Sequence, residues 1–245
     1  MKNYIKIPNL PTKKVTSVLV DYRMNVSSIK KLNELGISVY KTRYTNSLYN
    51  AVSGHPDMVI HHLSDNRFIV SPENFDYFKS IPGIEIIIGK SRLKSSYPDD
   101  ILYNAARVGD FLIHNFKYTD KNLLEQTEHL YKIDVKQGYS KCSVCVINKN
   151  SIITSDLGIA KKCDNYGIDV LFVDDSKIKL NGVSHGFIGG SCGLISPQLL
   201  AINGNLNQHT NCDEIQSFCA KYNVSIISLH NNKIEDIGSI ICLTE

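Results

Sequence analysis

Long apolar runs are missing from this sequence. No stretch of the 245 residues approaches the roughly 18 consecutive apolar residues of a membrane-spanning helix. The opening residues, MKNYIKIPNLPTKK, contain no apolar segment of the kind that a signal peptide requires. The sequence therefore predicts a cytoplasmic protein that does not enter a membrane.

An excess of one charge is also lacking. The chain has 27 Lys and Arg residues against 24 Asp and Glu residues, for a formal net charge of +3. The basic residues are scattered, whereas nucleic-acid-binding chains commonly concentrate them in a block or stripe. The pattern gives no indication of a nucleic-acid partner, although a patch assembled in three dimensions is left open. It does not indicate an oligomeric state.

Paired cysteine motifs are scarce. Seven cysteines, an odd number without a secretion signal, favour free thiols over a disulfide framework. Cys142 and Cys145 form one C-x-x-C pair, but the run CSVCVI alternates like a strand, on which residues three apart face opposite sides. No second such pair and no paired histidine motif accompanies it. We therefore expect two small buried residues here, with no metal site and no organic cofactor.

A strand–turn–strand–helix–strand pattern recurs along the chain. Its clearest copy reads CSVCVI, NKN, SIITSD, LGIAKKCDNYG and IDVLFVD, and similar copies begin at MVIHHL, ILYNAARV and SCGLIS. Second strands begin near Ser17, Arg67, Phe111, Ser151 and Leu199, at intervals of about 40 to 50 residues that are typical of repeat architectures. The sequence therefore predicts an array of repeated units.

One unit is split between the two ends of the chain. TSVLVD, VSSIKKLNELG and ISVYKT lack a first strand, while IGSIICLT near the C-terminus is a strand without a unit. Pairing of the two would close the array and remove exposed sheet edges. We expect one α/β domain over residues 1–245, a five-bladed ββαβ pseudo-symmetric propeller whose ring is closed by the C-terminal strand. A six-stranded open sheet is the alternative, and it leaves the last strand unexplained.

The segment GVSHGFIGGSCGLIS, residues 182–196, is rich in glycine. Gly189 and Gly190 precede a strand, whereas a phosphate cradle needs a glycine loop that opens onto a helix N-terminus. The pattern therefore excludes a phosphate site. We expect these glycines to let the backbone pass close to the central axis.

The predicted ring resembles the pentein, or β/α-propeller, architecture of the amidinotransferase and guanidino-modifying superfamily. Three segments are similar to dimethylarginine dimethylaminohydrolases. HPDMVIHHLSDNRFIVSPE places Asp57 at the position of an aspartate that contacts the guanidinium group in that family. GVSHGFIGGSCGLISPQLLAI places His185 at the family histidine, and EDIGSIICLTE places Cys242 at the nucleophilic cysteine, after Asp236 and Gly238.

The sequence also departs from that family. Two further acids expected about five residues after Asp57 are replaced by His62 and Leu63. A Gly-Gly-Asp motif before the fourth inner strand is replaced by residues of the run KCSVCV, led by Lys141 and Cys142. Negative charge that would hold a buried guanidinium is therefore reduced. The chain is also similar to a bacterial family known mainly by this fold, which implies no activity.

The resemblance implies a cysteine-dependent hydrolase of an amidino or guanidino C–N bond. Cys242 would be the nucleophile, His185 the acid and base, and Asp57 the group that orients the substrate. Each residue also has a purely structural interpretation. Cys242 would be a small buried strand residue, His185 a loop residue bonded to a carbonyl, and Asp57 a turn or capping residue.

Residues that lead into the inner strands are expected to meet at one mouth of the central pore. As substrate-binding candidates we name Asp57, His62, Asn104, Lys141, Ser143, Cys192 and Asp236. Their mixed charge suits a zwitterionic or neutral amide ligand, and such mouths commonly hold small molecules. The alternative is a catalytically inactive pentein that binds a small molecule or a macromolecule, since a ribosomal anti-association factor shares the fold without the catalysis.

Overall fold

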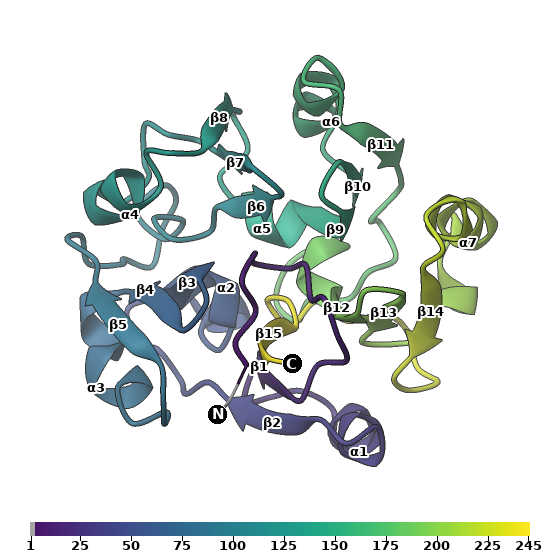
Figure 1. Ribbon diagram of the computed structural model, residues 1–245, viewed down its shortest axis with the longest axis horizontal. Coiled ribbons are helices and arrows are strands. Elements are labelled where there is room, and N and C mark those ends of the chain that lie inside the picture. Colours follow the sequence, from purple (N-terminus) through teal and green to yellow (C-terminus); the bar gives the residue numbers. More distant parts are fainter. Residues whose placement is uncertain (1–2) are drawn as a thin grey trace.

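Five small three-stranded sheets surround a common centre in the computed structural model, which describes residues 3–245 (Figure 1). In each sheet the strand nearest the centre pairs antiparallel with the middle strand, and the middle strand pairs parallel with the outer one. A parallel pair cannot be joined by a tight turn, so a helix connects the middle and outer strands and lies toward the rim (Figure 1).

The elements follow the same order in every unit. In the order inner strand, middle strand, helix and outer strand, the first unit consists of β15 (Ile241–Thr244), β1 (Ser17–Val20), α1 (Val26–Glu34) and β2 (Ser38–Lys41), and the second unit of β3 (Ile60–Ser64), β4 (Arg67–Val70), α3 (Phe75–Phe78) and β5 (Glu85–Ile88). The third unit consists of β6 (Ala106–Val108), β7 (Phe111–His114), α4 (Lys121–Gln126) and β8 (Tyr131–Asp134), and the fourth of β9 (Val144–Asn148), β10 (Ser151–Thr154), α6 (Leu157–Asp164) and β11 (Asp169–Phe172). The fifth unit consists of β12 (Cys192–Ser196), β13 (Leu199–Ile202), α7 (Cys212–Lys221) and β14 (Ser225–Ser228).

Short helical turns precede three of the inner strands. They are α2 (Pro56–Val59) before β3, α5 (Ser140–Ser143) before β9 and η3 (Gly189–Ser191) before β12. The remaining single turns are η1 (Asn50–Val52), η2 (Pro72–Asn74) and η4 (Leu206–Gln208). The turns before the inner strands matter most for function, because they bring side chains from separate units to the centre.

The repeat predicted from the sequence is confirmed, with one local correction. CSVCVI is not a strand throughout, because α5 ends at Ser143 and β9 begins only at Val144. The side chain of Asn104 accepts hydrogen bonds from the N–H groups of Lys141 and Cys142, and these bonds hold the helical turn. In the third unit Asp120 caps α4, because its carboxylate accepts from the N–H groups of Asn122 and Leu123.

The C-terminal strand completes the first sheet, as the split unit predicts. β15 pairs antiparallel with β1, and Cys242 stands opposite Val18 in the register. Among residues 3–245 strand pairing stays within each of the five sheets, so the sheets are open and the predicted closed ring is not confirmed. The units are therefore held together by side-chain packing and loop contacts.

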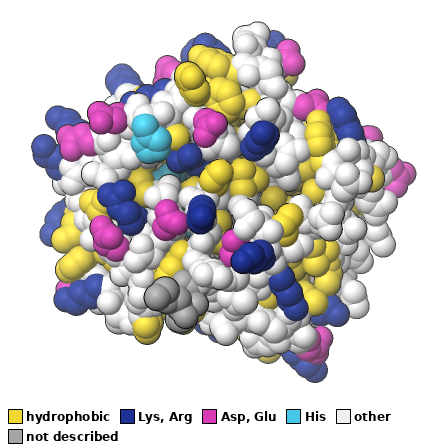
Figure 2. Space-filling model, viewed as in Figure 1, with side chains coloured by type: hydrophobic (Ala, Val, Ile, Leu, Met, Phe, Trp, Pro, Cys, Tyr) yellow, Lys and Arg dark blue, Asp and Glu magenta, His cyan; other side chains and the backbone are white. Residues whose placement is uncertain are grey.

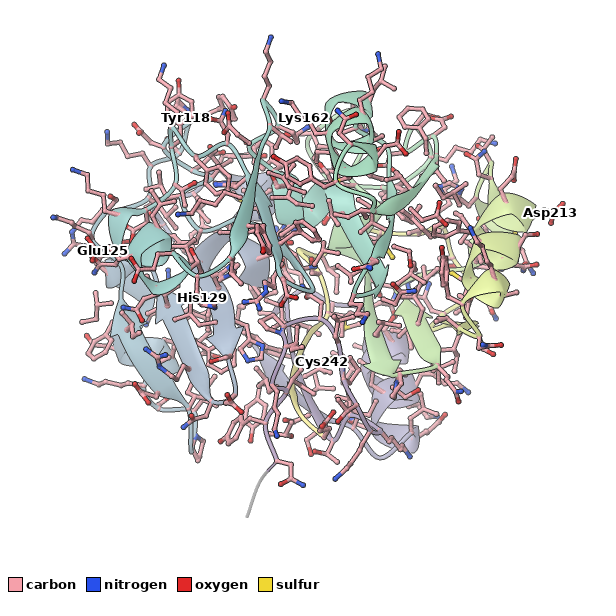
Figure 3. All side chains as sticks on the ribbon, turned by 45° about the horizontal axis from the view of Figure 1, so that its top comes forward. Tyr118, Glu125, His129, Lys162, Asp213 and Cys242 are labelled. Carbon is pink, nitrogen blue, oxygen red and sulfur yellow. The ribbon has the colours of Figure 1, made fainter. Side chains whose placement is uncertain are left out.

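The apolar core lies between neighbouring sheets. One cluster combines Val18 and Cys242 of the first sheet with Ile195 and Ala201 of the sheet formed by β12, β13 and β14. Every unit thus buries apolar side chains against the next one, as expected for repeats that cannot bury their faces alone. Figure 3 shows Cys242 deep inside the molecule, while other labelled residues such as Glu125 and Lys162 project from its rim.

The outer surface carries both signs of charge. On the face in Figure 2, Lys and Arg side chains are interspersed with Asp and Glu side chains and apolar groups. Within residues 3–245 no helix combines the length and the apolar character needed to cross a bilayer.

Candidate functional site

Equivalent positions of the five units meet at the centre. The residue two positions before each inner strand is Met58, Asn104, Cys142, Gly190 or Ser239. The amide nitrogen of Asn104 lies 3.3 Å from Sδ of Met58 and 3.2 Å from Sγ of Cys142. The pseudo-symmetry of the fold thus assembles one site from residues that are far apart in the sequence.

Cys142 and Asp57 form the core of this site. The thiol lies 3.3 Å from Oδ2 and 3.4 Å from Oδ1 of the carboxylate, and both residues are buried. Asn104 fixes the pair from the third unit, because its amide nitrogen donates to the carbonyl oxygen of Asp57 at 3.1 Å and also to the sulfur of Cys142. The thiol is therefore held in a defined orientation.

The hydroxyl of Ser239 links the carboxylate of Asp57 to the ammonium group of Lys141. Its hydroxyl lies 2.7 Å from Oδ2 of Asp57 and 2.9 Å from the carbonyl oxygen of Gly189, and it accepts from Nζ of Lys141 at 2.9 Å. The backbone of Ser239 has φ of 75°, a conformation that non-glycine residues rarely adopt. Such local strain is found most often at functional sites.

His55 lies between two buried carboxylates. Its Nδ1 is 3.8 Å from Oδ1 of Asp236 and its Nε2 is 4.0 Å from Oδ2 of Asp21. Neither ring nitrogen has a hydrogen-bond partner, although the side chain is only 1% exposed. Gly238 is required beside this ring, because a Cβ there would lie 2.3 Å from Cβ of His55. Buried imidazoles are normally hydrogen-bonded, so His55 is unusual in the described residues.

The electrostatic balance keeps the thiol protonated. Burial raises the pKa of Cys142 well above its ordinary value, and the negative charges of Asp57 and Asp236 add to this rise. Burial likewise raises the pKa of Asp236, although the adjacent His55 lowers it. A cation placed among these groups would reverse the effect, because opposite charge favours the ionised thiol and carboxylate.

Three of these side chains could also hold a metal ion. One ligand atom each from His55, Asp57 and Cys142 lies within 4.8 Å of the others. A nitrogen, an oxygen and a sulfur ligand suit a borderline-soft ion such as Zn²⁺. Whichever ring nitrogen of His55 bound the ion, the other would face a carboxylate, as in many zinc sites.

Four of the residues proposed from the sequence belong to this site, which we call the central cluster. Its members are His55, Asp57, Asn104, Lys141, Cys142, Asp236 and Ser239. Asp236 is held in place because its two oxygens accept from the N–H groups of Gly238 and Phe187, each at 2.9 Å. Asp57, Asn104, Lys141 and Asp236 were expected from the sequence.

Cys242 and His185 are not brought together. The thiol of Cys242 lies 3.0 Å from the carbonyl oxygen of Leu194 inside the apolar cluster around Val18, and burial raises its pKa to about 12. His185 instead lies in the loop before η3, where its Nδ1 is 3.0 Å from the carbonyl oxygen of Gly186. The neighbour of Cys242, Ile241, lines a cavity beside Asp57. Alternation along β15 therefore directs the thiol away from the axis.

The other three sequence candidates lie around the cluster. His62 stacks on Phe68 with ring centroids 4.3 Å apart, and burial lowers its pKa to about 4. The hydroxyl of Ser143 is buried without a hydrogen-bond partner. Cys192 is buried beside Cys145, whose pKa it raises.

Sequence reasoning missed His55, Cys142 and Ser239. A signal for two of them was available, because Cys142 and Ser239 stand at the same distance before their inner strands as Asn104 does before β6. His55 precedes Asp57 by two residues, but it carries no repeat signal of its own.

Small cavities flank the central cluster. A cavity of about 20 Å³ is lined by Asp57, Lys141 and Ile241, among others. Another of about 80 Å³ is lined by Asp21, Arg23 and Asp236, together with residues near Leu180. The smaller of these two spaces has room for about one water molecule, and the larger has about four times its volume.

Comparisons with solved structures show that the fold of this chain recurs in other proteins. The chain is similar to agmatine deiminase of C. jejuni, with a TM-score of 0.57 and 11% identity over 94% of this chain and 90% of that chain. It is similar to the amidinotransferase SxtG of Microseira wollei, with a TM-score of 0.54 and 10% identity over 93% and 91% of the two chains. DDAH from Pseudomonas aeruginosa gives 0.53 and 8% over 88% and 92%.

All three neighbours are pentein-fold guanidino-modifying enzymes, and at these identities the likeness shows the fold. No curated protein matches the chain. A family model described as a family of unknown function, DUF6873, matches residues 19–241. The chain therefore has the pentein fold and belongs to the DUF6873 family.

Proposed function

We propose that this protein is a cysteine-dependent hydrolase of an amidino C–N bond, and that Cys142 is its nucleophile. The observation that carries the proposal is the meeting of a thiol, an imidazole and a carboxylate within 4.8 Å at the centre of the ring. These are the groups that covalent catalysis at an sp² carbon needs. The pentein fold supports the same chemistry by analogy with its guanidino-modifying members.

The substrate would supply the charge that the free site lacks. Asp57 and Asp236 gather negative charge around Cys142 and His55, whereas Asp21, on the other side of His55, is already paired with Arg23. An amidinium cation beside Asp57 would offset this charge and lower the pKa of the thiol, which burial and the two nearer carboxylates hold high. The nucleophile would therefore ionise when substrate binds.

The reaction would proceed in two stages. Sγ of Cys142 attacks the amidino carbon while His55 takes the thiol proton and becomes an imidazolium between Asp21 and Asp236. The imidazolium protonates the departing amine, the C–N bond breaks, and the amidino carbon stays bound to sulfur. His55 then takes a proton from water, the C–O bond forms and the C–S bond breaks, and that proton restores the thiol. One water is consumed and one amine is released.

The test is amine or ammonia release from a panel of guanidino and amidino compounds. We expect release by the unaltered chain, and a loss of about a thousandfold or more for Cys142→Ala, as is typical when a covalent nucleophile is removed. Cys242→Ala is the matched control, because that thiol contacts a backbone carbonyl inside an apolar cluster. Full activity of Cys142→Ala, or equal losses in both variants, would refute the proposal.

A non-catalytic pentein that binds a small molecule at the pore mouth is the second candidate. The observation that favours it is the position of Lys141, whose ammonium group lies 2.9 Å from Ser239, the residue bonded to Asp57. Asp57 thus already has a cation nearby without a substrate. Guanidinium binding by calorimetry without turnover of any compound would support this candidate. Pull-down of a macromolecular partner by a chain that binds no small molecule would favour an interaction protein instead.

A further inference from the structure

A third cavity, of about 400 Å³, opens beside the C-terminal end of β11. The residues that we use from its lining are Asp156, Phe172, Asp174, Asp175, His185 and Phe187. This volume lies in the range of pockets that hold small organic ligands, whereas the cavities at the central cluster are several times smaller. The cavity is therefore large enough to hold a small organic ligand.

The charge of this cavity is one-sided. Three aspartates line it, and no lysine or arginine among residues 3–245 does. Asp156 and Asp174 are bonded locally, to Ile159 N–H and to Ser176 respectively. Asp175 is different, because it is only 3% exposed and its Oδ1 has no hydrogen-bond partner. Its Oδ2 accepts from the hydroxyl of Ser155 and, at 3.2 Å, from the N–H of Ile188.

Uncompensated charge on Asp175 is costly. A buried carboxylate ordinarily has a cation or a full set of hydrogen bonds. Burial raises the pKa of Asp175 to about 6, and its hydrogen bonds to Ser155 and Ile188 only partly offset this. A positive group in the cavity would reduce the free-energy cost of the buried Asp175 carboxylate.

Aromatic side chains line the same space. Phe172, the last residue of β11, is 51% exposed. Phe187 packs edge-on against His185, with ring centroids 5.9 Å apart and an interplanar angle of 81°. The faces of aromatic rings attract organic cations, and this attraction grows where water is excluded.

A bare metal ion does not fit this arrangement. In the described part of the chain, only His55, Asp57 and Cys142 bring three ligand atoms of the Asp, Glu, His and Cys type within 4.8 Å of one another. The aspartates of this cavity therefore do not form such a three-ligand group. Carboxylates that are spread around a space with aromatic walls suit a larger cation with an apolar body.

We infer that this cavity binds an organic ammonium ion, with Asp175 as the counter-charge and Phe172 and Phe187 as its apolar walls. The cavity adjoins the central cluster, because the N–H of Phe187 donates to Asp236, but no residue of the cluster lines it. The inference does not depend on the proposed hydrolysis. It assigns His185 to the wall of a ligand site and not to the thiol chemistry.

Isothermal titration calorimetry with n-butylammonium tests the inference. We expect the full chain to bind n-butylammonium at millimolar concentration. It should not bind n-butanol, which has a similar shape without the charge. Asp175→Asn should weaken binding about tenfold or more, since it removes the charge and keeps the shape. Asp213→Asn is the matched control, because Asp213 is exposed on α7 and outside the cavity (Figure 3).

A second variant keeps the inference testable if Asp175→Asn fails to fold. Phe172→Ala changes an exposed side chain, so it should fold normally and still bind n-butylammonium several-fold more weakly. Equal binding of n-butanol, no binding of n-butylammonium, or unchanged affinity in a folded Phe172→Ala variant would each overturn the inference. Competition by Mg²⁺ as strong as by the ammonium ion would also overturn it.

Discussion

The thiol of Cys142 lies 3.3 Å from Oδ2 of Asp57, across 85 positions of sequence. This contact places a nucleophile beside a carboxylate that raises its pKa. Asp57→Asn should therefore lower the pKa of the thiol and speed its alkylation by iodoacetamide. The same change should abolish amidine hydrolysis, because the substrate cation loses its counter-charge. Mass spectrometry of the peptide that contains Cys142 measures the alkylation.

The alkylation experiment needs a background without Cys212, the one cysteine that is not buried in the described residues. Cys212→Ser removes this faster competing thiol. Asp65→Asn is the matched control, because Asp65 is exposed and its φ of 45° is one that asparagine tolerates. Alkylation of Asp57→Asn that is no faster than that of the control would contradict the electrostatic argument.

Zinc should inhibit the proposed hydrolysis. His55, Asp57 and Cys142 offer nitrogen, oxygen and sulfur atoms within 4.8 Å, so Zn²⁺ would capture the thiol as thiolate. We expect inhibition by micromolar Zn²⁺, full recovery with a chelator, and no effect of Mg²⁺, which prefers oxygen ligands. Calorimetry should show weaker zinc binding by Cys142→Ser. If chelation alone removed activity, the centre would be a metal site and Cys142 a ligand instead of a nucleophile.

Gly190 should not tolerate a side chain. A Cβ at this position would lie 2.1 Å from Oδ1 of Asp236, which holds the Gly238 N–H and faces His55. Gly190→Ala should cost about 1–3 kcal/mol in the free energy of unfolding and should lower hydrolysis by displacing Asp236. Denaturant unfolding and the amine-release assay measure the two effects.

The control for this substitution is Gly158→Ala in α6. The nearest atom to its added Cβ is a carboxylate oxygen of Asp156 at 3.0 Å, and alanine favours a helix. Its stability should change by less than about 1 kcal/mol. Equal effects of the two substitutions would mean that the contact with Asp236 is not decisive.

Buried histidines should make the fold sensitive to acid. Burial lowers the pKa of His61 to about 3 and the pKa values of His62 and His114 to about 4. Between these values and the unfolded pKa near 6.5, the unfolded chain binds more protons, so stability rises with pH there. The contribution of these three neutral histidines to the free energy of unfolding is therefore fully present above about pH 6.5, and it is lost as the pH falls toward 4.

Urea unfolding at a series of pH values tests this. Each neutral histidine contributes a slope of about 1.4 kcal/mol per pH unit in that window. His114→Gln should reduce the slope, whereas His129→Gln should not, because His129 is exposed (Figure 3). A flat profile from pH 7 to pH 4.5 would show that the three rings are not neutral in the folded state.

Much of the architecture was predictable because it repeats. Tight turns such as NKN and alternating runs such as SIITSD depend on local preferences, and these recur in each unit. Asn104 could be named as a site residue because it precedes an inner strand, and Asp57 because the segment around it resembles that of a known family. The start of β9 was predicted wrongly, since CSVCVI alternates like a strand but Asn104 holds its first residues in a helical turn.

The sequence by itself determined the repeated units, the split of the first unit between the two chain ends, and the gathering of polar residues before the inner strands. Only the tertiary structure decided which of them meet. Cys242 and Ile241 are adjacent, yet the pleat of β15 turns the thiol into the apolar cluster and Ile241 toward the cavity beside Asp57. Cys142, His55 and Asp236 come from separate units, and only packing around the centre places them in contact. Local preferences act over a few residues, whereas these contacts join positions that the chain connects only through whole sheets.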